Sequence, residues 1–225
     1  MSMSVTEALH TRISTRDFLP DPVPESVVRD ILEQARWSPS GGNVQPWRVE
    51  VVAGAERQAV IDLARNTLAA NPAGDDAGIP IYPANLWEPY RSRRFKIGED
   101  MYATMGIERE NKAARFAHVA RNMEFFGAPV GMFFIIDRGM GHGQWAHLGM
   151  FIQSVALAAT ERGIQSCIQE AWAPVRGALG QHFGIADNEV LYCGMALGHA
   201  NPANPMNSLR SDRAEVDEIA TFRGF

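Results

Sequence analysis

The chain has 225 residues and a mass of 24.8 kDa; 46% of its residues are hydrophobic, 21% are charged, and its formal net charge is −5. This hydrophobic content is ordinary for a globular protein and excludes a disordered or fibrous chain. With 21 basic against 26 acidic side chains there is no global positive field, so we expect neither nucleic acid nor a membrane as a partner. The length predicts one large domain.

Cysteine usage and the distribution of apolar residues indicate the compartment. Cys167 and Cys193 lie inside apolar, strand-like runs, and we expect two buried free thiols, as is usual in a reducing compartment. The longest apolar stretch, residues 128–136, has about half of the length that a bilayer requires. The first residues lack the basic and hydrophobic regions of a signal peptide, so we expect a cytoplasmic protein.

The first seventy residues predict three helices, a loop and a strand. Ser4 and Glu7 fit a capping box, which opens a short helix through His10. An apolar stripe predicts a second helix, entered through Pro24 and ending at Ala35. The remaining elements are a loop over residues 37–45, a strand over 47–52 and a helix over 54–70.

The composition changes between residues 71 and about 115. This stretch combines prolines, aromatic residues and a basic run, namely Pro72, Pro80, Pro83, Pro89, Tyr82, Trp87, Tyr90, Tyr102, Arg91, Arg93 and Arg94. Prolines at this density argue against a core element, and the aromatic content argues against disorder. Long irregular segments are often functional lids, and we expect a lid-like insert here.

The second half predicts alternating helices and buried strands. In order, these are a helix over 116–126, a strand over 128–136, a helix over 144–162, a strand over 164–169, a helix starting at Pro174, and a strand over 189–197. The helix over 144–162 is apolar around most of its circumference, so we expect burial on all sides, in the core or in a subunit interface. The mixture indicates an α+β or α/β protein.

Two basic clusters, one near each end of the chain, are candidate anion sites. Arg12-Ile-Ser-Thr-Arg16 carries two guanidinium groups with a hydroxyl between them, a combination that suits a phosphate. Arg210-Ser-Asp-Arg213 supplies a second basic pair. The alternative for each cluster is a solvated group of surface charges.

Two polar segments are candidate ligand contacts. Residues 39–47, Pro-Ser-Gly-Gly-Asn-Val-Gln-Pro-Trp, contain two glycines that let the backbone approach a flat ligand, and polar side chains that can bind it; the alternative is an ordinary loop. Gln169-Glu-Ala-Trp172 follows a buried strand, where loops present backbone groups to ligands. Zinc spacing, a nucleophile elbow and a phosphate loop are absent from the sequence.

In combination and order, these motifs resemble the FMN-dependent nitroreductase family. The resemblance rests on the Arg-x-Ser-x-Arg motif, the loop Ser-Pro-Ser-Gly-Gly-Asn-x-Gln-Pro-Trp, the helix before Gly163, the strand end at Gln169 and Arg213. It covers the chain except the insert at about 71–115. It implies an α+β fold with a central mixed sheet flanked by helices, in an intertwined homodimer. The expected domain is a single one over 1–225, with a C-terminal extension from about residue 199.

The resemblance also implies an FMN site built from both chains. The residues that match the binders of the ribityl phosphate are Arg12, Ser14 and Arg16, with Arg213 as a second basic position and Arg210 near it. The loop that the partner lays against the flavin is matched by Pro39, Ser40, Gly41 and Asn43. Glu170 and Ala171 match the pair whose backbone amides face the flavin ring. The lysine that some members of the family place near the pyrimidine edge has no counterpart here, and the candidates to replace it are Arg91, Arg93 and Arg94.

The implied activity is the reduction of an electron-poor acceptor, such as a nitroaromatic or a quinone, with NADH or NADPH in a ping-pong cycle on FMN. Such a mechanism requires no acid or base side chain and no metal, and we expect none. The alternatives are a relative with reductive dehalogenation or flavin fragmentation, and a non-catalytic flavin-binding protein. A scaffold dimer without flavin is a weaker alternative.

We expect the insert to determine the acceptor and to leave flavin binding unaffected. Trp87 and Tyr90 suit stacking over a planar acceptor, and Arg94 suits a carboxylate or nitro group, so these three residues are the expected acceptor contacts. The alternative is a surface loop that packs only against itself.

Overall fold

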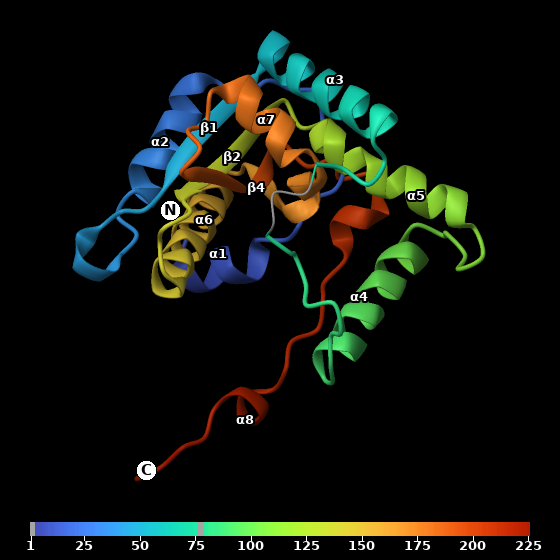
Figure 1. The fold of residues 1–225 in the computed structure, drawn as a ribbon. Helices are drawn as coiled ribbons and strands as arrows, with labels where there is room; N and C mark the ends of the chain where they lie inside the picture. Colours follow the sequence, from blue (N-terminus) through green and yellow to red (C-terminus); the bar gives the residue numbers. More distant parts are fainter. Residues whose placement is uncertain (1–2, 76–78) are drawn as a thin grey trace.

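The computed structural model describes residues 3–75 and 79–225, in which helices surround one sheet (Figure 1). The strands are β1 (Arg48–Ala53), β2 (Val130–Asp137), β3 (Gln165–Gln169) and β4 (Glu189–Gly198). The α-helices are α1 (Val5–Thr11), α2 (Glu25–Ala35), α3 (Gly54–Ala70), α4 (Tyr90–Thr104), α5 (Lys112–Ala120), α6 (His142–Glu161), α7 (Arg176–Phe183) and α8 (Val216–Ile219). Short 3-10 helices are η1 (Gly41–Asn43), η2 (Arg121–Gly127), η3 (Glu170–Val175) and η4 (Pro205–Ser208). Residues 76–78 of the expected insert lie outside the described residues.

The strands of the sheet lie in the order β1-β2-β4-β3, and every neighbouring pair is antiparallel. The expected mixed sheet is therefore antiparallel in its named strands, and parallel pairing within the described residues is limited to one bridge between Ser14 and Ser166. The apolar pattern of a strand reports its burial and does not encode the direction of its neighbours.

Helices cover both faces of the sheet. Alternate residues of each strand point to opposite faces, so the apolar residues of one strand pack into two cores. On β2, Met132 and Phe134 join a core formed with α2 and α6. Phe133 and Ile135 join a second core, formed with α3, η3 and α7. Central strands buried on both faces explain why β2 and β4 are continuous apolar runs.

Two glycines in the central strands make room for aromatic rings. A Cβ atom on Gly131 would lie 2.4 Å from the ring of Phe125, and one on Gly194 would lie 2.5 Å from Trp172. The Phe125 and Trp172 rings pack with their centroids 4.7 Å apart. The packing of η2 and η3 against the sheet thus depends on these two strand positions.

Helix α6 is buried along one face only in the single chain. Leu148, Ile152 and Val155 are buried, whereas Met150 on another face is 48% exposed. The prediction of burial on all sides, in the core or in a subunit interface, is confirmed for one face, and burial of the exposed face against a second chain stays a prediction. An apolar pattern cannot distinguish a face that packs inside the chain from a face left for another surface.

The insert is more regular than predicted. Its prolines are confined to residues 72–89, and α4 starts directly after Pro89. The helix predicted over 116–126 starts earlier, at Lys112, and ends at Ala120. The continuation is the 3-10 segment η2, which is kinked at Phe125 and Phe126, whose φ of 53° lies outside the range of a right-handed helix.

The remaining expectations differ from the structure by a few residues. The capping box of Ser4 and Glu7 is present, and both cysteines are buried and free. The helix expected to start at Pro174 is divided, because Pro174 lies in η3 and α7 begins at Arg176. No helix among the described residues has the length and apolar character needed to cross a membrane.

Candidate functional site

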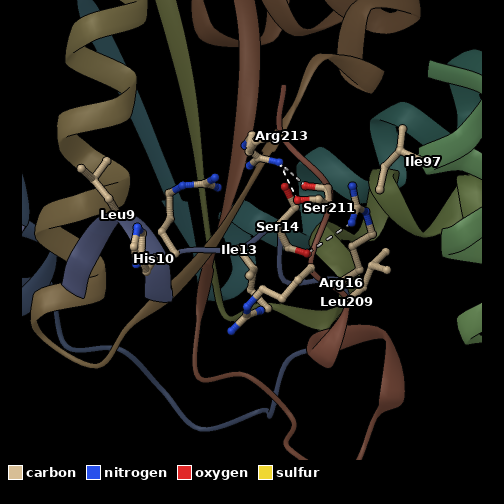
Figure 2. Close-up of a pocket in the computed structure, with 11 residues that line it drawn as sticks. Leu9, His10, Ile13, Ser14, Arg16, Ile97, Leu209, Ser211 and Arg213 are labelled. Carbon is tan, nitrogen blue, oxygen red and sulfur yellow. Dashed lines mark hydrogen bonds between the residues drawn. The ribbon is translucent and has the colours of Figure 1, made fainter. Parts of the chain in front are cut away.

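Both ends of the chain contribute to one cavity of about 340 Å³, which we call the anion cavity (Figure 2). It is lined by α1 and the segment after it, by the tail after η4, and by one residue of α4; these residues are Leu9, His10, Arg12, Ile13, Ser14, Arg16, Ile97, Leu209, Arg210, Ser211 and Arg213. The two basic clusters near opposite ends of the sequence therefore meet in space.

The anion cavity is strongly positive. Four of its lining residues are arginines and none is acidic. The Nε atom of Arg12 is buried and has no hydrogen-bond partner in the described structure. Burial and, second, the charge of Arg213 lower the pKa of Arg12. A buried donor and uncompensated charge are costly unless an anion satisfies them, and a phosphate has the oxygen geometry that guanidinium groups fit.

Pairing with the sheet positions the first basic cluster. Thr15 N donates to Ser166 O at 3.0 Å, and the Thr15 side chain is fully buried. Alternate residues of this extended segment therefore face away from the core, which places Ser14 and Arg16 at the cavity. Arg16 N also donates to Asn207 Oδ1 at 3.0 Å, which connects the segment to η4.

In the second basic cluster, the charge of the Arg213 guanidinium is not neutralised by its hydrogen-bond partners. Arg213 Nη1 donates to Ser211 O, Ser211 Oγ and Asp212 O at 2.5–2.9 Å. These acceptors are neutral and belong to the same segment, so they hold the side chain without compensating its charge. Arg210, which the resemblance placed only near the second basic position, lines the same cavity.

The field of these arginines extends to buried neighbours. Burial together with the charges of Arg16 and Arg121 lowers the pKa of His118 to about 4, so His118 is neutral at pH 7. Burial raises the pKa of Cys167, while the charges of Arg16 and Arg12 act in the opposite direction. Both groups are neutral, and the net positive charge of the site is carried by the arginines.

The loop over residues 39–45 lies away from the anion cavity. It projects from the body on the side opposite to α4 (Figure 1). Ser40 Oγ accepts from Gln45 N at 2.9 Å, and Gly41 N donates to His147 Nδ1 at 3.4 Å. Asn43 and Gln45 have φ values of 53° and 51°, a strained conformation that is often found at ligand-binding loops. The expected contacts Pro39, Ser40, Gly41 and Asn43 therefore do not join the cavity within one chain.

Glu170 and Ala171 lie at the start of η3, directly after β3. The Ser14–Ser166 bridge connects β3 to the first basic cluster, and four residues of extended strand span roughly 13 Å to Glu170. The Glu170 carboxylate accepts from Tyr192 Oη at 2.7 Å. Burial, then this contact, raises the pKa of Tyr192. The side chain of Glu170 is thus turned toward β4.

The expected acceptor contacts are on or beside α4. Trp87 is 59% exposed and packs edge-on against Tyr90 with a centroid distance of 5.6 Å. Arg94 lies over the Tyr82 ring at 4.3 Å and lines an open hollow between residues 83–86 and α4. None of the three lines the anion cavity; the residue of α4 that does is Ile97.

A protein-family model matches most of the chain. The model of the Nitroreductase family matches residues 9–199 of the chain. This protein belongs to the nitroreductase family. The first basic cluster, the loop over 39–45 and the start of η3 all fall within the matched part of the nitroreductase chain.

Curated relatives span nearly the whole nitroreductase chain. Nitrobenzene nitroreductase of Ectopseudomonas oleovorans is 33% identical over 97% of this chain and 96% of its own length. 4-Nitrobenzoate reductase of Pseudomonas putida is 33% identical, with 96% and 93% covered. The activities in these names are those of the relatives.

A solved structure has nearly the same fold. The FMN and NADPH-dependent nitroreductase NfnB from Sphigopyxis sp. strain HMH superimposes with a TM-score of 0.95, at 40% identity over 99% of this chain and 100% of that chain. The FMN-dependent nitroreductase NfnB from Mycobacterium smegmatis in complex with NADPH gives a TM-score of 0.90, at 27% identity over 98% and 100%.

Sequence reasoning missed three residues of this nitroreductase that shape the site. Ile97 lines the anion cavity, Asn207 connects the two ends of the chain, and Tyr192 binds the Glu170 side chain. Asn207 lies in the expected C-terminal extension, but no local pattern indicated its partner. Nothing in the sequence around Ile97 or Tyr192 indicates a role at the site, which is seen only from their contacts in the structure.

Proposed function

We propose that this protein is an FMN-dependent oxidoreductase that uses NADPH or NADH to reduce electron-poor acceptors such as nitroaromatics or quinones in a ping-pong cycle. The observation that carries the proposal is the convergence of four arginines from both ends of the chain on one cavity without an acidic lining residue. Membership in the nitroreductase family and the names of the relatives support the same activity.

The residues of the anion cavity fit the phosphate of FMN. Arg12, Arg16, Arg210 and Arg213 would hold its oxygens, and Ser14 would add a donor. The buried, partnerless Nε of Arg12 supports this assignment, because a bound anion would satisfy it. Bound FMN supplies the transfer of hydride and electrons, and the protein orients it and shields it from water.

The start of η3 would face the flavin ring. The Glu170 side chain is occupied by its contact with Tyr192 of β4, so the proposed contact with the ring is through the backbone N–H groups of Glu170 and Ala171. A backbone donor at the edge of a reduced ring stabilises developing negative charge without a change of protonation in the protein. We therefore assign no side chain as general acid or base.

The proposal includes a homodimer in which each site takes residues from both chains. The loop over 39–45 and the anion cavity lie on different sides of one chain, so a site that contains both needs a second copy. The exposed face of α6, with Met150, offers a surface for that contact. We further infer a single domain with an insert at about 71–115 and an extension from about residue 199, and a cytoplasmic location suited to the buried free thiols.

Titration under anaerobic conditions tests the proposal. The purified protein should have a flavin spectrum that bleaches on addition of NADPH or NADH and returns when a nitroaromatic is added. Steady-state oxidation of the nucleotide should continue for many turnovers. A colourless protein that does not take up added FMN would overturn the proposal, and a single turnover would indicate a flavin-binding protein without catalysis. Light scattering should give twice the mass of the chain.

A further inference from the structure

We propose that Lys96 of α4 is a positioning residue for the anion cavity, where it holds the tail segment 210–214, and with it Arg213, through an ion pair with Asp212. The proposal rests on the proposed function, since it concerns how the same cavity retains the FMN phosphate. It assigns part of cofactor retention to the insert.

The tail segment 210–214 has no backbone anchor of its own. Within residues 3–75 and 79–225, no backbone-to-backbone hydrogen bond joins it to another element. The anchor ahead of it is η4, where Met206 is buried and the Asn207 side chain donates to Asp17 O at 2.8 Å. Beyond η4, side-chain contacts must hold the segment in place.

Those contacts come from one face of α4. Lys96 Nζ lies 2.8 Å from Asp212 Oδ2 and 2.6 Å from Asp100 Oδ2. Arg93 Nη2 lies 3.1 Å from Glu218 Oε2 in α8. Positions 93, 96 and 100 are spaced by three and four residues, so they share a helix face. The tail runs along this helix in Figure 1.

The same contacts adjoin the cavity. Asp212 stands between Ser211 and Arg213, and Lys96 precedes Ile97; all three of these neighbours line the anion cavity. A second hollow of about 240 Å³ between α4 and the tail shares Ile97 and Arg213 with it. Figure 2 shows Ile97 of α4 and the tail residues Ser211 and Arg213 as lining residues that belong to two different elements.

The position of the Arg213 guanidinium depends on the segment. Arg213 Nη1 donates only to oxygens of residues 211 and 212 within the described structure, so the side chain moves with that backbone. If the Lys96–Asp212 contact is lost, Arg213 moves away from the phosphate. The expectation that the insert leaves flavin binding unaffected is therefore not supported by the geometry, since α4 both lines the cavity and holds one of its walls.

Charge reversal on the FMN-loaded protein tests the proposal. We compare the parent with Lys96→Glu, Asp212→Lys and the double variant that exchanges the charges. The matched control is Lys112→Glu, which makes the same change of charge at an exposed site at the start of α5. The readouts are the FMN dissociation rate, the FMN and riboflavin Kd from flavin fluorescence, and the Tm of each apoprotein.

In Lys96→Glu, FMN should dissociate about threefold to fivefold faster than from the parent at low salt, as expected for an exposed ion pair. The difference should shrink at high salt. The double variant should return to within about twofold of the parent, Lys112→Glu should match the parent, and the riboflavin Kd should not change.

Equal FMN dissociation from Lys96→Glu and Lys112→Glu would overturn the positioning role while leaving the proposed function intact. A parallel loss of riboflavin affinity, or no rescue in the double variant, would overturn it as well. Absence of FMN binding in the parent would instead refute the proposed function itself.

Discussion

The molecule contains two arginine-rich regions whose chemistry differs. In the anion cavity, Arg12, Arg16, Arg210 and Arg213 converge without an acidic lining residue. In the insert, three arginines pair with carboxylates: Arg91 with Glu88, Arg93 with Glu218 and Arg115 with Glu99. Arg94 and Arg109 instead lie over the rings of Tyr82 and Phe95, which hold the side chains without neutralising their charge. The sequence presents both regions as basic runs. Only the first gathers four arginines in one cavity whose lining contains no carboxylate.

Whether a basic run can bind an anion depends on whether its arginines are already paired with carboxylates. An arginine paired with a carboxylate on the surface contributes modestly to stability and offers a ligand little net charge. An arginine without a carboxylate, and with a buried donor beside it, retains its capacity for an anion. The comparison therefore predicts that substitutions of the arginines in the two regions affect different properties.

The largest effect is expected from the anion cavity. Arg16→Gln removes one charge-assisted contact and should weaken FMN binding by about 1.5–3 kcal/mol, or roughly 10- to 150-fold, as measured by fluorescence titration. The riboflavin Kd should stay near the parent value because riboflavin lacks the phosphate. An equal loss of riboflavin affinity would make Arg16 a structural residue.

His118 lies between the two regions, since it is near Arg16 and its ring contacts Tyr102 of α4 at a centroid distance of 6.3 Å. Its folded-state pKa of about 4 is below the ordinary value of 6.5, so the unfolded chain binds more protons between these values. Its contribution to the free energy of unfolding is present above pH 6.5 and is lost as the pH falls toward 4. Urea unfolding at pH 7 and pH 5 should show a smaller loss for His118→Phe than for the parent. An identical loss would mean that other groups carry the pH dependence.

Substitution of Arg94 should change the choice of acceptor. We expect Arg94→Ala to lower kcat/KM for a nitroaromatic that carries a carboxylate by about threefold to tenfold relative to nitrobenzene, with unchanged FMN content. The matched control is Arg91→Ala, because Arg91 is paired with Glu88. If Arg94→Ala reduces all acceptors equally, the arginine supports the insert through its contact with Tyr82 and does not contact the acceptor.

The smallest effect is expected for Arg115→Gln. Arg115 pairs with Glu99 at 2.6 Å and lies over the Tyr102 ring at 4.1 Å, so its loss should loosen α4 against α5. We expect a decrease of about 1–2 °C in Tm by calorimetry, and FMN affinity within twofold of the parent. A strong loss of FMN affinity would remove the distinction between the two regions.

Local pattern was sufficient to predict much of this protein. The capping box of Ser4 and Glu7, the strand periodicity and the breakers around α3 all act within a few residues, and the structure contains these features where they were expected. The boundary of α4 is a partial exception. Its start after Pro89 is a local signal, which the density of prolines before it concealed.

The tertiary structure alone decided which polar residues meet. Arg16 and Asn207 are 191 positions apart, and Lys96 and Asp212 are 116 apart, and nothing in either local pattern specifies the other partner. The apolar pattern of α6 likewise did not specify which of its faces packs inside the chain, because hydrophobicity reports that a residue avoids water and does not report which surface covers it. Helix and strand periodicity arise from local backbone geometry, whereas the charge balance of a cavity depends on every side chain that the fold brings to it.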